Sequence, residues 1–421
     1  MTQPDLQSHP ERQRARSMPL EEIDVSRGYL FEQDVVEFYF ERLRREDPVH
    51  RSHSKRYGQY WSVTRYQDIM AVDTNHAVFS SAAGLGGITL AERPQEEMYP
   101  SFIAMDPPRH DEQRKTVSPI VAPANLALLE GTIRARAGAI LDGLPIGEEF
   151  DWVKRVSIEL TTQMLATLFD FPFEERNLLT WWSDMATGDP DGNGPVTSWE
   201  QRLIELGKCR DYFTRLWNER VNAPPGSDLI SMLAHGPSTR NMGPDEFLGN
   251  LLLLIVGGND TTRNSISGGL LALNHHPAEY DRLIANPQLI TSLVPEIIRW
   301  QTPLAHMRRT ALADAVVGGK TIRKGDKVVM WYLSGNRDER AIEEPHRFII
   351  DRARPRQHLS FGFGIHRCVG NRLAELQLKV LWEEILARFP RIEVTGTPVR
   401  TKSNFVRGFV SMPVVIPKRH N

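Results

Sequence analysis

A long helical pattern in the second half of the chain constrains the fold most. It extends from about Pro244 to His275. Pro244 suits a first helical turn, Asp245 and Glu246 favour the positive end of the helix dipole, and the stretch from Asn274 to Pro277 signals the end. At about 1.5 Å per residue, such a helix would be close to ~50 Å long. It would cross a whole domain, so the rest of the chain must pack around it.

Shorter patterns on both sides predict a mainly α fold with small β-sheets. The residues between 82 and 105 form an irregular segment rich in glycine and apolar residues. Helices are expected over residues 36–46, 66–73, about 108–114, 125–141, 155–168, 174–186, 198–221, about 290–300, and from after 368 to about 388. Short strands are expected at residues 60–63 and around 308–310, 315–317, 320–322 and 327–330.

Composition indicates one globular domain without a nucleic-acid partner. Apolar residues make up 40% of the 421, enough for a sizeable core. The 51 Lys and Arg against 53 Asp and Glu give no basic excess of the kind that nucleic-acid binding needs. No composition break divides the chain, so we expect a mobile polar tail over residues 1–25 and a single domain over 26–421.

The polar N-terminus and the cysteine count both favour a soluble cytoplasmic protein. The first eighteen residues contain neither a signal sequence nor a membrane anchor, and the longest apolar run, Leu251 to Val256, is too short to span a bilayer. Cys209 and Cys368 lie far apart in sequence, so no disulfide framework is indicated and a reducing compartment is expected.

The most informative local pattern is FGFGIHRCVG, residues 361–370, a glycine-rich loop that feeds directly into a helix. A cysteine at this junction, Cys368, receives backbone N–H donors and the positive helix end, which favour thiolate over thiol. The glycines allow the backbone to approach a flat cofactor. A buried, inert cysteine is the alternative, and it is the better interpretation for Cys209 in GKCRDYF.

This loop resembles the haem loop of the cytochrome P450 superfamily, F-G-x-G-x-H/R-x-C-x-G, at all six fixed positions. The resemblance extends over roughly residues 30–418. It implies the P450 fold, a helical prism around a buried haem b (iron protoporphyrin IX), with Cys368 as the axial ligand of the iron and Phe361, Gly362 and Gly364 beside the cofactor. A thiolate ligand favours O–O cleavage. No C-x-x-C-H motif for covalent haem attachment is present.

The middle of the long helix reads GGNDTT, residues 257–262. Paired glycines are unfavourable in a helix unless space is needed, either for a tightly packed neighbour or for a ligand. With the haem loop present, the segment resembles the oxygen-binding groove of the family. There a threonine hydroxyl holds oxygen bound at the iron and an acid relays protons from solvent. Thr261 and Asp260 match these catalytic positions.

Two further groups match structural and cofactor-binding positions of the family. Glu296 and Arg299 form E-x-x-R on one helix face, and the family joins this pair to a third residue, here Arg352, as a structural triad. The haem propionates are carboxylates, which arginine binds through paired hydrogen bonds. The positions that resemble propionate contacts are His110, Arg114, Arg309 and His358, with Arg308 competing for the place of Arg309.

Segments such as SFIAMDPPRHDEQRK and WYLSGNRDER resemble the bacterial soluble alkane and fatty-acid terminal hydroxylases. The resemblance implies a monooxygenase that inserts one oxygen atom of O₂ into a C–H bond. Without a membrane anchor or fused flavin or nicotinamide module, it should receive NAD(P)H-derived electrons from ferredoxin and ferredoxin reductase. By family position the apolar substrate pocket should draw on Leu85, Ile88, Leu90, Phe102, Ile103, Leu253, Val256, Gly257, Leu304, Ala305, Met307, Phe405 and Val406.

Three alternatives remain open from the residues. The same chemistry could act on a bulkier terpenoid or steroid. A peroxide-driven or rearranging haem-thiolate enzyme would need Cys368 but not the acid–alcohol pair. A non-catalytic haem sensor would need neither a groove nor a proton path. The pair Asp260 and Thr261 favours the monooxygenase.

Overall fold

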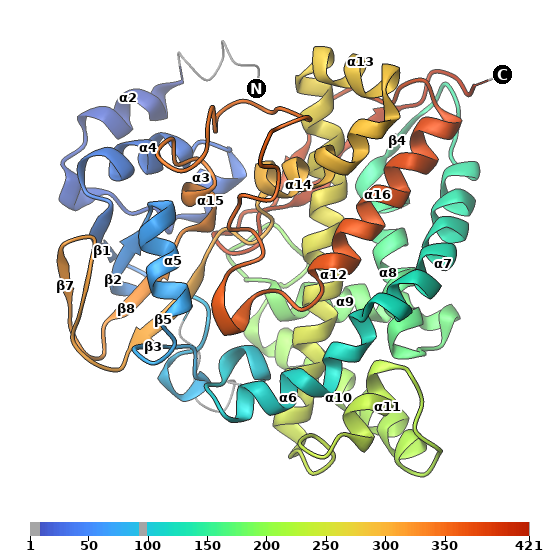
Figure 1. The fold of residues 1–421 in the computed structure, drawn as a ribbon, viewed down its shortest axis with the longest axis horizontal. Helices are drawn as coiled ribbons and strands as arrows, with labels where there is room; N and C mark the ends of the chain where they lie inside the picture. Colours follow the sequence, from blue (N-terminus) through green and yellow to red (C-terminus); the bar gives the residue numbers. More distant parts are fainter. Residues whose placement is uncertain (1–8, 92–98, 421) are drawn as a thin grey trace.

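One central helix organises the molecule (Figure 1). The computed structural model describes residues 9–91 and 99–420. Helix α12, Pro244–His275, has the predicted bounds and passes through the middle of the fold. Its 32 residues span about 48 Å at the usual rise per residue. The predicted long helix is therefore confirmed.

The predicted, mainly helical fold class is confirmed, and several of the remaining helices pack against α12. The α-helices are α2 (Pro10–Ser17), α3 (Gly28–Glu32), α4 (Glu37–Glu46), α5 (Tyr66–Thr74), α6 (Arg109–Val117), α7 (Pro123–Asp142), α8 (Glu159–Phe169), α9 (Asn177–Thr187), α10 (Trp199–Val221), α11 (Leu229–His235), α13 (Pro277–Ala285), α14 (Ile290–Gln301), α15 (Tyr332–Gly335) and α16 (Asn371–Arg388). A π-helical segment, η6 (Val153–Ile158), leads into α8, and a 3₁₀ turn, η9 (Gly364–His366), lies in the cysteine loop.

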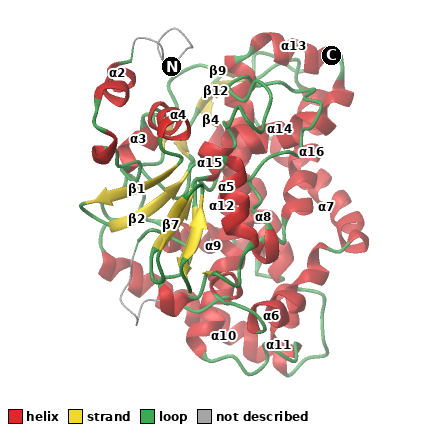
Figure 2. Ribbon diagram, turned by 60° about the vertical axis from the view of Figure 1, so that its left-hand side comes forward, coloured by secondary structure: helices red, strands yellow, loops and turns green. Residues whose placement is uncertain are grey.

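The strands form small sheets, of which the largest lies to one side of the helices (Figure 2). Its order is β1-β2-β8-β5-β3, and only the β2–β8 pair is parallel. The other sheets are β4-β12-β9, β10-β11 and β6-β7. The strands are β1 (Val49–Ser54), β2 (Gly58–Val63), β3 (Phe79–Ser80), β4 (Glu149–Asp151), β5 (Met307–Ala311), β6 (Ala315–Val317), β7 (Lys320–Ile322), β8 (Lys327–Met330), β9 (Glu393–Val394), β10 (Val399–Arg400), β11 (Phe409–Ser411) and β12 (Pro413–Val415).

The expected tail over residues 1–25 is too long. Residues 1–8 lie outside the described residues, but residues 10–17 form α2, where Ala15 is fully buried. The Arg42 guanidinium on α4 donates to the Ala15 carbonyl at 2.7 Å and also to the Met18 carbonyl. A few small or apolar residues in a polar sequence are therefore enough to dock this segment, and their weak pattern explains why the prediction was wrong.

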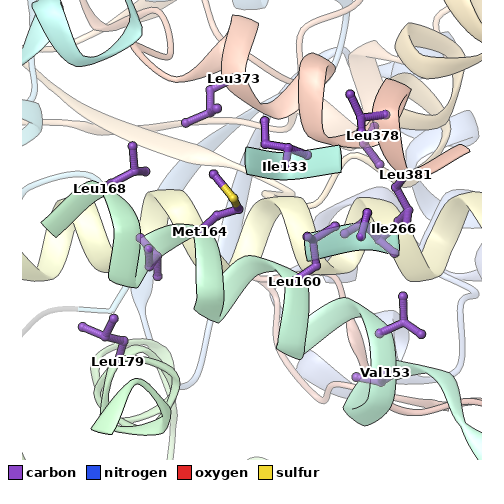
Figure 3. Packing of buried hydrophobic residues seen from close by; sticks show 14 of the residues in the cluster. Ile133, Val153, Leu160, Met164, Leu168, Leu179, Ile266, Leu373, Leu378 and Leu381 are labelled. Atoms are coloured by element: carbon purple, nitrogen blue, oxygen red, sulfur yellow. The ribbon is translucent and has the colours of Figure 1, made fainter. Parts of the chain in front are cut away.

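The main hydrophobic core lies between α12 and the helices α7, α8 and α16 (Figure 3). Leu160 from α8 lies near Ile266 from α12, and Met164 from α8 lies near Ile133 from α7. Each of these side chains is at most 1% exposed. Full burial of such a side chain contributes about 1.5–3 kcal/mol, so this core fixes α12 firmly beside the cysteine loop. Among the described residues, none of the helices is both long and apolar enough to cross a membrane.

Candidate active site

A large cavity connects the cysteine loop with the middle of α12. Its volume is about 670 Å³. Cys368 and Phe361 from the loop line it, as do Thr261 and Gly257 from α12 and residues of the irregular segment 82–105. The described structure therefore brings the two most informative motifs of the sequence to one space, as predicted.

The loop is held by its own backbone and by α5. The Cys368 N–H donates to the Phe361 carbonyl at 2.8 Å. Gly362 and Gly364 have φ of +64° and +65°, a conformation that disfavours other residues. Gly362 lines the cavity, but a Cβ at Gly364 would lie 2.7 Å from the Asp73 carbonyl oxygen on α5. Gly364 is thus needed for contact with α5, and among the described residues it does not line the cavity.

Cys368 is exposed and lines the cavity. Burial raises the pKa of its thiol, while the Gly370 backbone N–H and the charges of Arg114 and Arg367 lower it. The donors expected from the sequence are therefore present, although burial has the larger effect on the pKa of the thiol. A coordinated metal ion deprotonates such a thiol outright. Cys209 is fully buried, and burial raises its pKa well above the usual value, as expected for an inert thiol.

Basic side chains gather next to Cys368. Arg114, Arg309 and His366 line the cavity, and the His110 ring lies edge-on to His366 with 4.4 Å between centroids. Within the described part of the chain, the buried His110 Nε2 and His366 Nδ1 have no hydrogen-bond partner. Two guanidinium groups and two unsatisfied imidazole nitrogens beside a cysteine fit a cofactor that carries two carboxylates and a metal, such as haem.

The positions of the side chains show which of the adjacent Arg308 and Arg309 faces the cavity. Arg309 lines the cavity, and its Nη2 donates to Asp73 Oδ1 at 2.9 Å. Arg308 is not among the cavity residues, and its Nη2 donates to the Leu85 carbonyl at 3.1 Å. Asp73, which sequence reasoning missed, also accepts the Phe363 N–H at 2.8 Å. One buried carboxylate thus positions both Arg309 and the cysteine loop.

The predicted propionate contact of His358 is not supported. His358 is buried outside the cavity lining, and its Nδ1 accepts the Ser360 N–H at 3.3 Å. Burial, and then the nearby charge of Arg299, lower its pKa to about 3. His366 occupies the cavity position instead. Because it lies two residues before Cys368, the turn η9 directs it to the same wall, which spacing alone does not reveal.

The two glycines of the pair in α12 have different roles: one allows close helix packing, and the other leaves space in the cavity. A Cβ at Gly258 would lie 2.6 Å from Leu165 Cδ2 on α8, so this glycine allows close helix packing. Gly257 faces the cavity, and a Cβ there would meet nothing within 4 Å. The Thr261 hydroxyl also faces the cavity and donates to the Gly257 carbonyl at 2.9 Å. The helix is assigned without a break through this segment.

Asp260 points in another direction from Thr261. Its side chain is fully buried and is not part of the cavity lining. The carboxylate accepts hydrogen bonds from Ser183 and Thr187 on α9 at 3.2 and 3.1 Å, and it pairs with Arg263 at 2.9 Å. The acid and the alcohol are adjacent in sequence but belong to different polar networks.

The predicted triad is present. Glu296 and Arg299 are fully buried, and the Arg299 Nε and Nη2 atoms donate to the carboxylate, each at 2.7 Å. Arg352 Nε donates to the same carboxylate at 3.0 Å. The remaining Arg299 nitrogen donates to the carbonyls of Asn336 and Pro345. The triad therefore joins α14 to the segments that precede the cysteine loop.

Most of the predicted pocket residues line the cavity, namely Ile88, Leu90, Phe102, Ile103, Leu253, Val256, Gly257, Leu304, Met307 and Phe405. The other three do not. Leu85 is 43% exposed and lies outside the lining. Ala305 packs in the cluster around Trp331, and the buried Val406 forms a β-bridge to Leu304. In an extended backbone, neighbours of lining residues point to the opposite side.

His306 is a positioning residue that sequence reasoning missed. It is fully buried, its Nδ1–H donates to the Asn404 carbonyl at 2.9 Å, and its Nε2 accepts the Leu90 N–H at 3.3 Å. Burial lowers its pKa to about 4, which keeps it neutral. The neutral ring therefore ties the irregular segment to the C-terminal loop that carries Phe405. Only the fold brings these segments together.

Comparisons with known proteins agree with this arrangement. A family profile described as Cytochrome P450 matches residues 223–416. Linalool 8-monooxygenase from Pseudomonas putida is 37% identical over 409 residues, which cover 95% of this chain and 100% of that protein. The methyl-branched lipid omega-hydroxylase of Mycobacterium tuberculosis is 30% identical over 416 residues, covering 94% and 95%. The structure of cytochrome P450-153 from Novosphingobium aromaticivorans superposes with a TM-score of 0.87 at 45% identity, covering 93% and 99%.

These similarities extend over nearly the whole chain and include the fold as well as the sequence. They agree with a cavity that combines a cysteine with carboxylate-binding groups. The chain therefore belongs to the cytochrome P450 family, as a monooxygenase that uses haem b.

Proposed function

We propose that this enzyme hydroxylates the terminal carbon of medium-chain linear alkanes or fatty acids, with electrons from a ferredoxin and its reductase. The observation that carries the proposal is the apolar wall of the cavity. Leu90 and Phe102 come from the irregular segment, Val256 from α12, Leu304 from the segment after α14, and Phe405 from the C-terminal loop. Such a wall favours a substrate with little to hydrogen-bond.

The apolar wall predicts how affinity depends on chain length. Each buried CH₂ contributes about 0.8 kcal/mol, so longer chains should bind more tightly until the cavity is filled. This hydrophobic contribution does not depend on the orientation of the chain, so it cannot determine which carbon is hydroxylated. Terminal attack needs a narrow approach, because internal C–H bonds are weaker and react first wherever they reach the reactive centre. The shape of the cavity wall must therefore keep the internal carbons away from the reactive centre, although their C–H bonds are weaker.

In this proposal, the Cys368 sulfur would hold the haem iron, and Phe361 and Gly362 would lie beside the cofactor. His110, Arg114, Arg309 and His366 would hold the propionates. Bound haem b supplies the activation of O₂ and the oxidation of an unactivated C–H bond. The apolar lining orients the chain and excludes water. Thr261 Oγ1 holds or passes a proton at the cavity wall, and Asp260 supplies protons from behind it.

A bulkier terpenoid is the second candidate substrate. The similarity to linalool 8-monooxygenase favours it. The similarity to the methyl-branched lipid omega-hydroxylase instead favours attack at a chain end. The two candidates differ in shape rather than in chemistry, so product analysis separates them.

The proposal is tested by product analysis with purified enzyme, ferredoxin and ferredoxin reductase. Linear alkanes and fatty acids of increasing length are compared with a cyclic terpenoid and a steroid. We expect predominantly terminal alcohols from the linear chains, with affinity rising with length. Mainly subterminal alcohols, or oxidation of the ring compounds alone, would contradict the proposal and leave the monooxygenase assignment unchanged.

Shortening Leu304 is expected to change the position of attack. Leu304 lines the cavity, so Leu304→Ala widens the space in which the chain lies. Internal carbons then reach the reactive centre, and the share of internal alcohols from octane should rise severalfold. The matched control is Leu283→Ala on α13, which removes a fully buried leucine outside the cavity. If both variants retain the wild-type product ratio, Leu304 does not shape the approach.

The proposed ferredoxin docks on the face next to Cys368, where arginines are exposed. Arg354, Arg367 and Arg372, which lie near Cys368 in the sequence, are exposed, whereas the exposed Arg356 pairs with Glu375 at 2.9 Å. Ferredoxins are typically acidic, so attraction should speed the encounter. The screening length falls from about 30 Å at 0.01 M salt to about 3 Å at 1 M. We therefore expect the rate of reduction by ferredoxin to fall steeply with salt.

Stopped-flow reduction at increasing salt measures this dependence. Substrate affinity serves as the control, because an apolar substrate should not lose affinity in the same way. Arg367→Gln and Arg372→Gln should flatten the salt dependence, whereas Arg356→Gln should have a smaller effect. A reduction rate that does not change with salt would rule out electrostatic docking on this face.

A further inference from the structure

A buried carboxylate lies directly behind one arginine of the cavity wall. Asp73 on α5 is 2% exposed and does not line the cavity. Its Oδ1 accepts a hydrogen bond from Arg309 Nη2 at 2.9 Å, and both side chains of this ion pair are buried. Arg309 itself lines the cavity. Asp73 can therefore act on a molecule in the cavity only through its neighbours.

The second oxygen of Asp73 binds the cysteine loop. Its Oδ2 accepts hydrogen bonds from the Tyr332 hydroxyl and from the Phe363 N–H, each at 2.8 Å. Burial, and then the charge of Asp73, raise the pKa of the Tyr332 phenol well above its usual value, so the hydroxyl remains a donor. One carboxylate thus connects α5 with β5, with α15 and with the loop that carries Cys368.

The two arginines of the proposed propionate site differ in what lies behind them. Arg114 Nη2 donates to a backbone carbonyl, that of Arg367, at 2.5 Å. Arg309 instead donates to the full negative charge of Asp73. The positive charge that Arg309 presents to the cavity is therefore partly balanced from behind. A carboxylate that binds Arg309 from the cavity side would share this cation with Asp73.

We propose that Asp73 is a positioning residue for the haem. Its carboxylate holds the Arg309 guanidinium and the Phe363 end of the cysteine loop in a fixed relation, and its negative charge opposes the charge of Arg309 beside the cofactor. Reduction adds an electron to the iron, which a nearby anion disfavours and a nearby cation favours. Asp73 therefore lowers the reduction potential of the enzyme. The inference rests on the proposed contact of Arg309 with a propionate.

A purely structural role for the same contacts makes different predictions. If the ion pair only joined α5 to β5, replacing either partner would disturb the same packing, and the two replacements would not shift the potential in opposite directions. A charge effect requires opposite directions, because Asp73→Asn removes a negative charge and Arg309→Gln removes a positive one. In Arg309→Gln, Asp73 keeps its charge because Tyr332 and Phe363 still donate to it.

Two replacements of Asp73 separate the arginine from the loop. An asparagine side chain has one acceptor oxygen and a donor NH₂ group. With that oxygen at the place of Oδ2, Asp73→Asn still accepts from Tyr332 and Phe363, but its NH₂ group cannot accept from Arg309. Asp73→Ala removes all three hydrogen bonds. The first variant therefore releases the arginine alone, and the second releases the loop as well.

Asp338→Asn is the matched control. Like Asp73, Asp338 is 2% exposed, lies outside the cavity lining and is bonded to α5, since its Oδ2 accepts the Tyr66 N–H at 2.8 Å. It has no contact with Arg309 among those that the described residues make. This variant should therefore lose stability but keep the wild-type reduction potential. It shows what the loss of a buried aspartate on the same helix does by itself.

The potential is measured by spectroelectrochemical titration of the haem-loaded enzyme, with and without octane. In Asp73→Asn and Asp73→Ala we expect the equilibrium to shift about tenfold toward the reduced state, a rise of about 59 mV for a one-electron couple. Arg309→Gln should shift it in the opposite direction. The same shifts with and without octane would show that they do not arise from altered substrate binding.

A second measurement reports the loop without any electron transfer. Amide hydrogen exchange of the haem-loaded enzyme is followed by mass spectrometry on peptides that contain Phe363. In Asp73→Ala the Phe363 amide should exchange about tenfold faster than in the wild type, because its hydrogen bond to a charged group is lost. In Asp73→Asn and in Asp338→Asn it should exchange at nearly the wild-type rate.

The outcomes separate this inference from the proposed propionate contact. If Arg309→Gln keeps the wild-type haem content and potential, Arg309 does not bind the cofactor, and both fail together. If Arg309→Gln lowers the potential while Asp73→Asn behaves like Asp338→Asn, the propionate contact stands and the charge role of Asp73 is wrong. Unchanged exchange at Phe363 in Asp73→Ala would overturn its role in holding the loop.

Discussion

Cys368→Ala is expected to yield protein that has lost both the thiolate-type carbon monoxide spectrum and monooxygenase activity. Cys368 is the cysteine that lines the cavity, next to Arg114, Arg309 and His366. Alanine offers no ligand to the iron, and without the thiolate the electron donation that favours O–O cleavage is absent. Haem content and the carbon monoxide difference spectrum of the purified variant measure this loss.

Cys209→Ala is the control for cysteine replacement. Cys209 is fully buried in α10, where its pKa is raised by burial. This variant should keep the spectrum and the activity. A normal thiolate spectrum in Cys368→Ala would overturn the ligand assignment, as would its loss in Cys209→Ala.

Glu296→Gln is expected to destabilise the fold by about 3–5 kcal/mol, because it leaves two buried guanidinium groups without their common counter-charge. Glu296 and Arg299 are fully buried, and Arg352 is nearly so. Chemical denaturation of the purified variant measures the loss. Glu344→Gln is the control, since it breaks an exposed pair with Arg347 and should cost no more than about 1 kcal/mol. Equal effects in the two variants would show that the triad does not stabilise the core.

The same contact predicts a pH dependence. Burial raises the pKa of Glu296, but the hydrogen bonds and charges of Arg299 and then Arg352 outweigh it, so the net pKa is lowered. The contribution of a carboxylate with a lowered pKa is fully present above its unfolded value, near ~4.3, and is lost as pH falls through the folded value. The stability difference between wild type and Glu296→Gln should therefore shrink below about pH 4. A difference that grew in acid would contradict this sign.

The sequence predicted those parts of the site that depend on local pattern. The bounds of α12, the turn before Cys368 and the i,i+3 pair of Glu296 and Arg299 all follow from spacing within one element. The sequence also predicted that the glycine pair provides space, either for a closely packed neighbour or for a ligand. The structure assigned packing to Gly258 and ligand space to Gly257.

The sequence could not predict side-chain positions that depend on contacts between distant segments. His358 and His366 both precede Cys368, and only the course of the loop decides which one reaches the cavity. Asp260 is adjacent to Thr261, yet consecutive residues on a helix point about 100° apart, so Asp260 faces α9. Spacing cannot predict partners that a second helix provides.

Strand β1 illustrates a different difficulty. Its sequence, VHRSHS, lacks the apolar alternation typical of a strand. Ser52 is nevertheless fully buried, because its hydroxyl pairs with that of Ser62 on β2 at 2.8 Å. A buried polar pair across two strands has no signature in either strand alone.

The position of the oxygen label in the product of octane tests the central claim most directly. The purified enzyme, with ferredoxin, ferredoxin reductase and NADPH, is supplied with ¹⁸O₂, and the alcohols are separated by gas chromatography and their label is read by mass spectrometry. Terminal hydroxylation by a monooxygenase predicts mainly 1-octanol carrying one ¹⁸O atom. Labelled 2-, 3- and 4-octanol as the main products would contradict terminal attack, and unlabelled alcohol would contradict oxygen insertion from O₂.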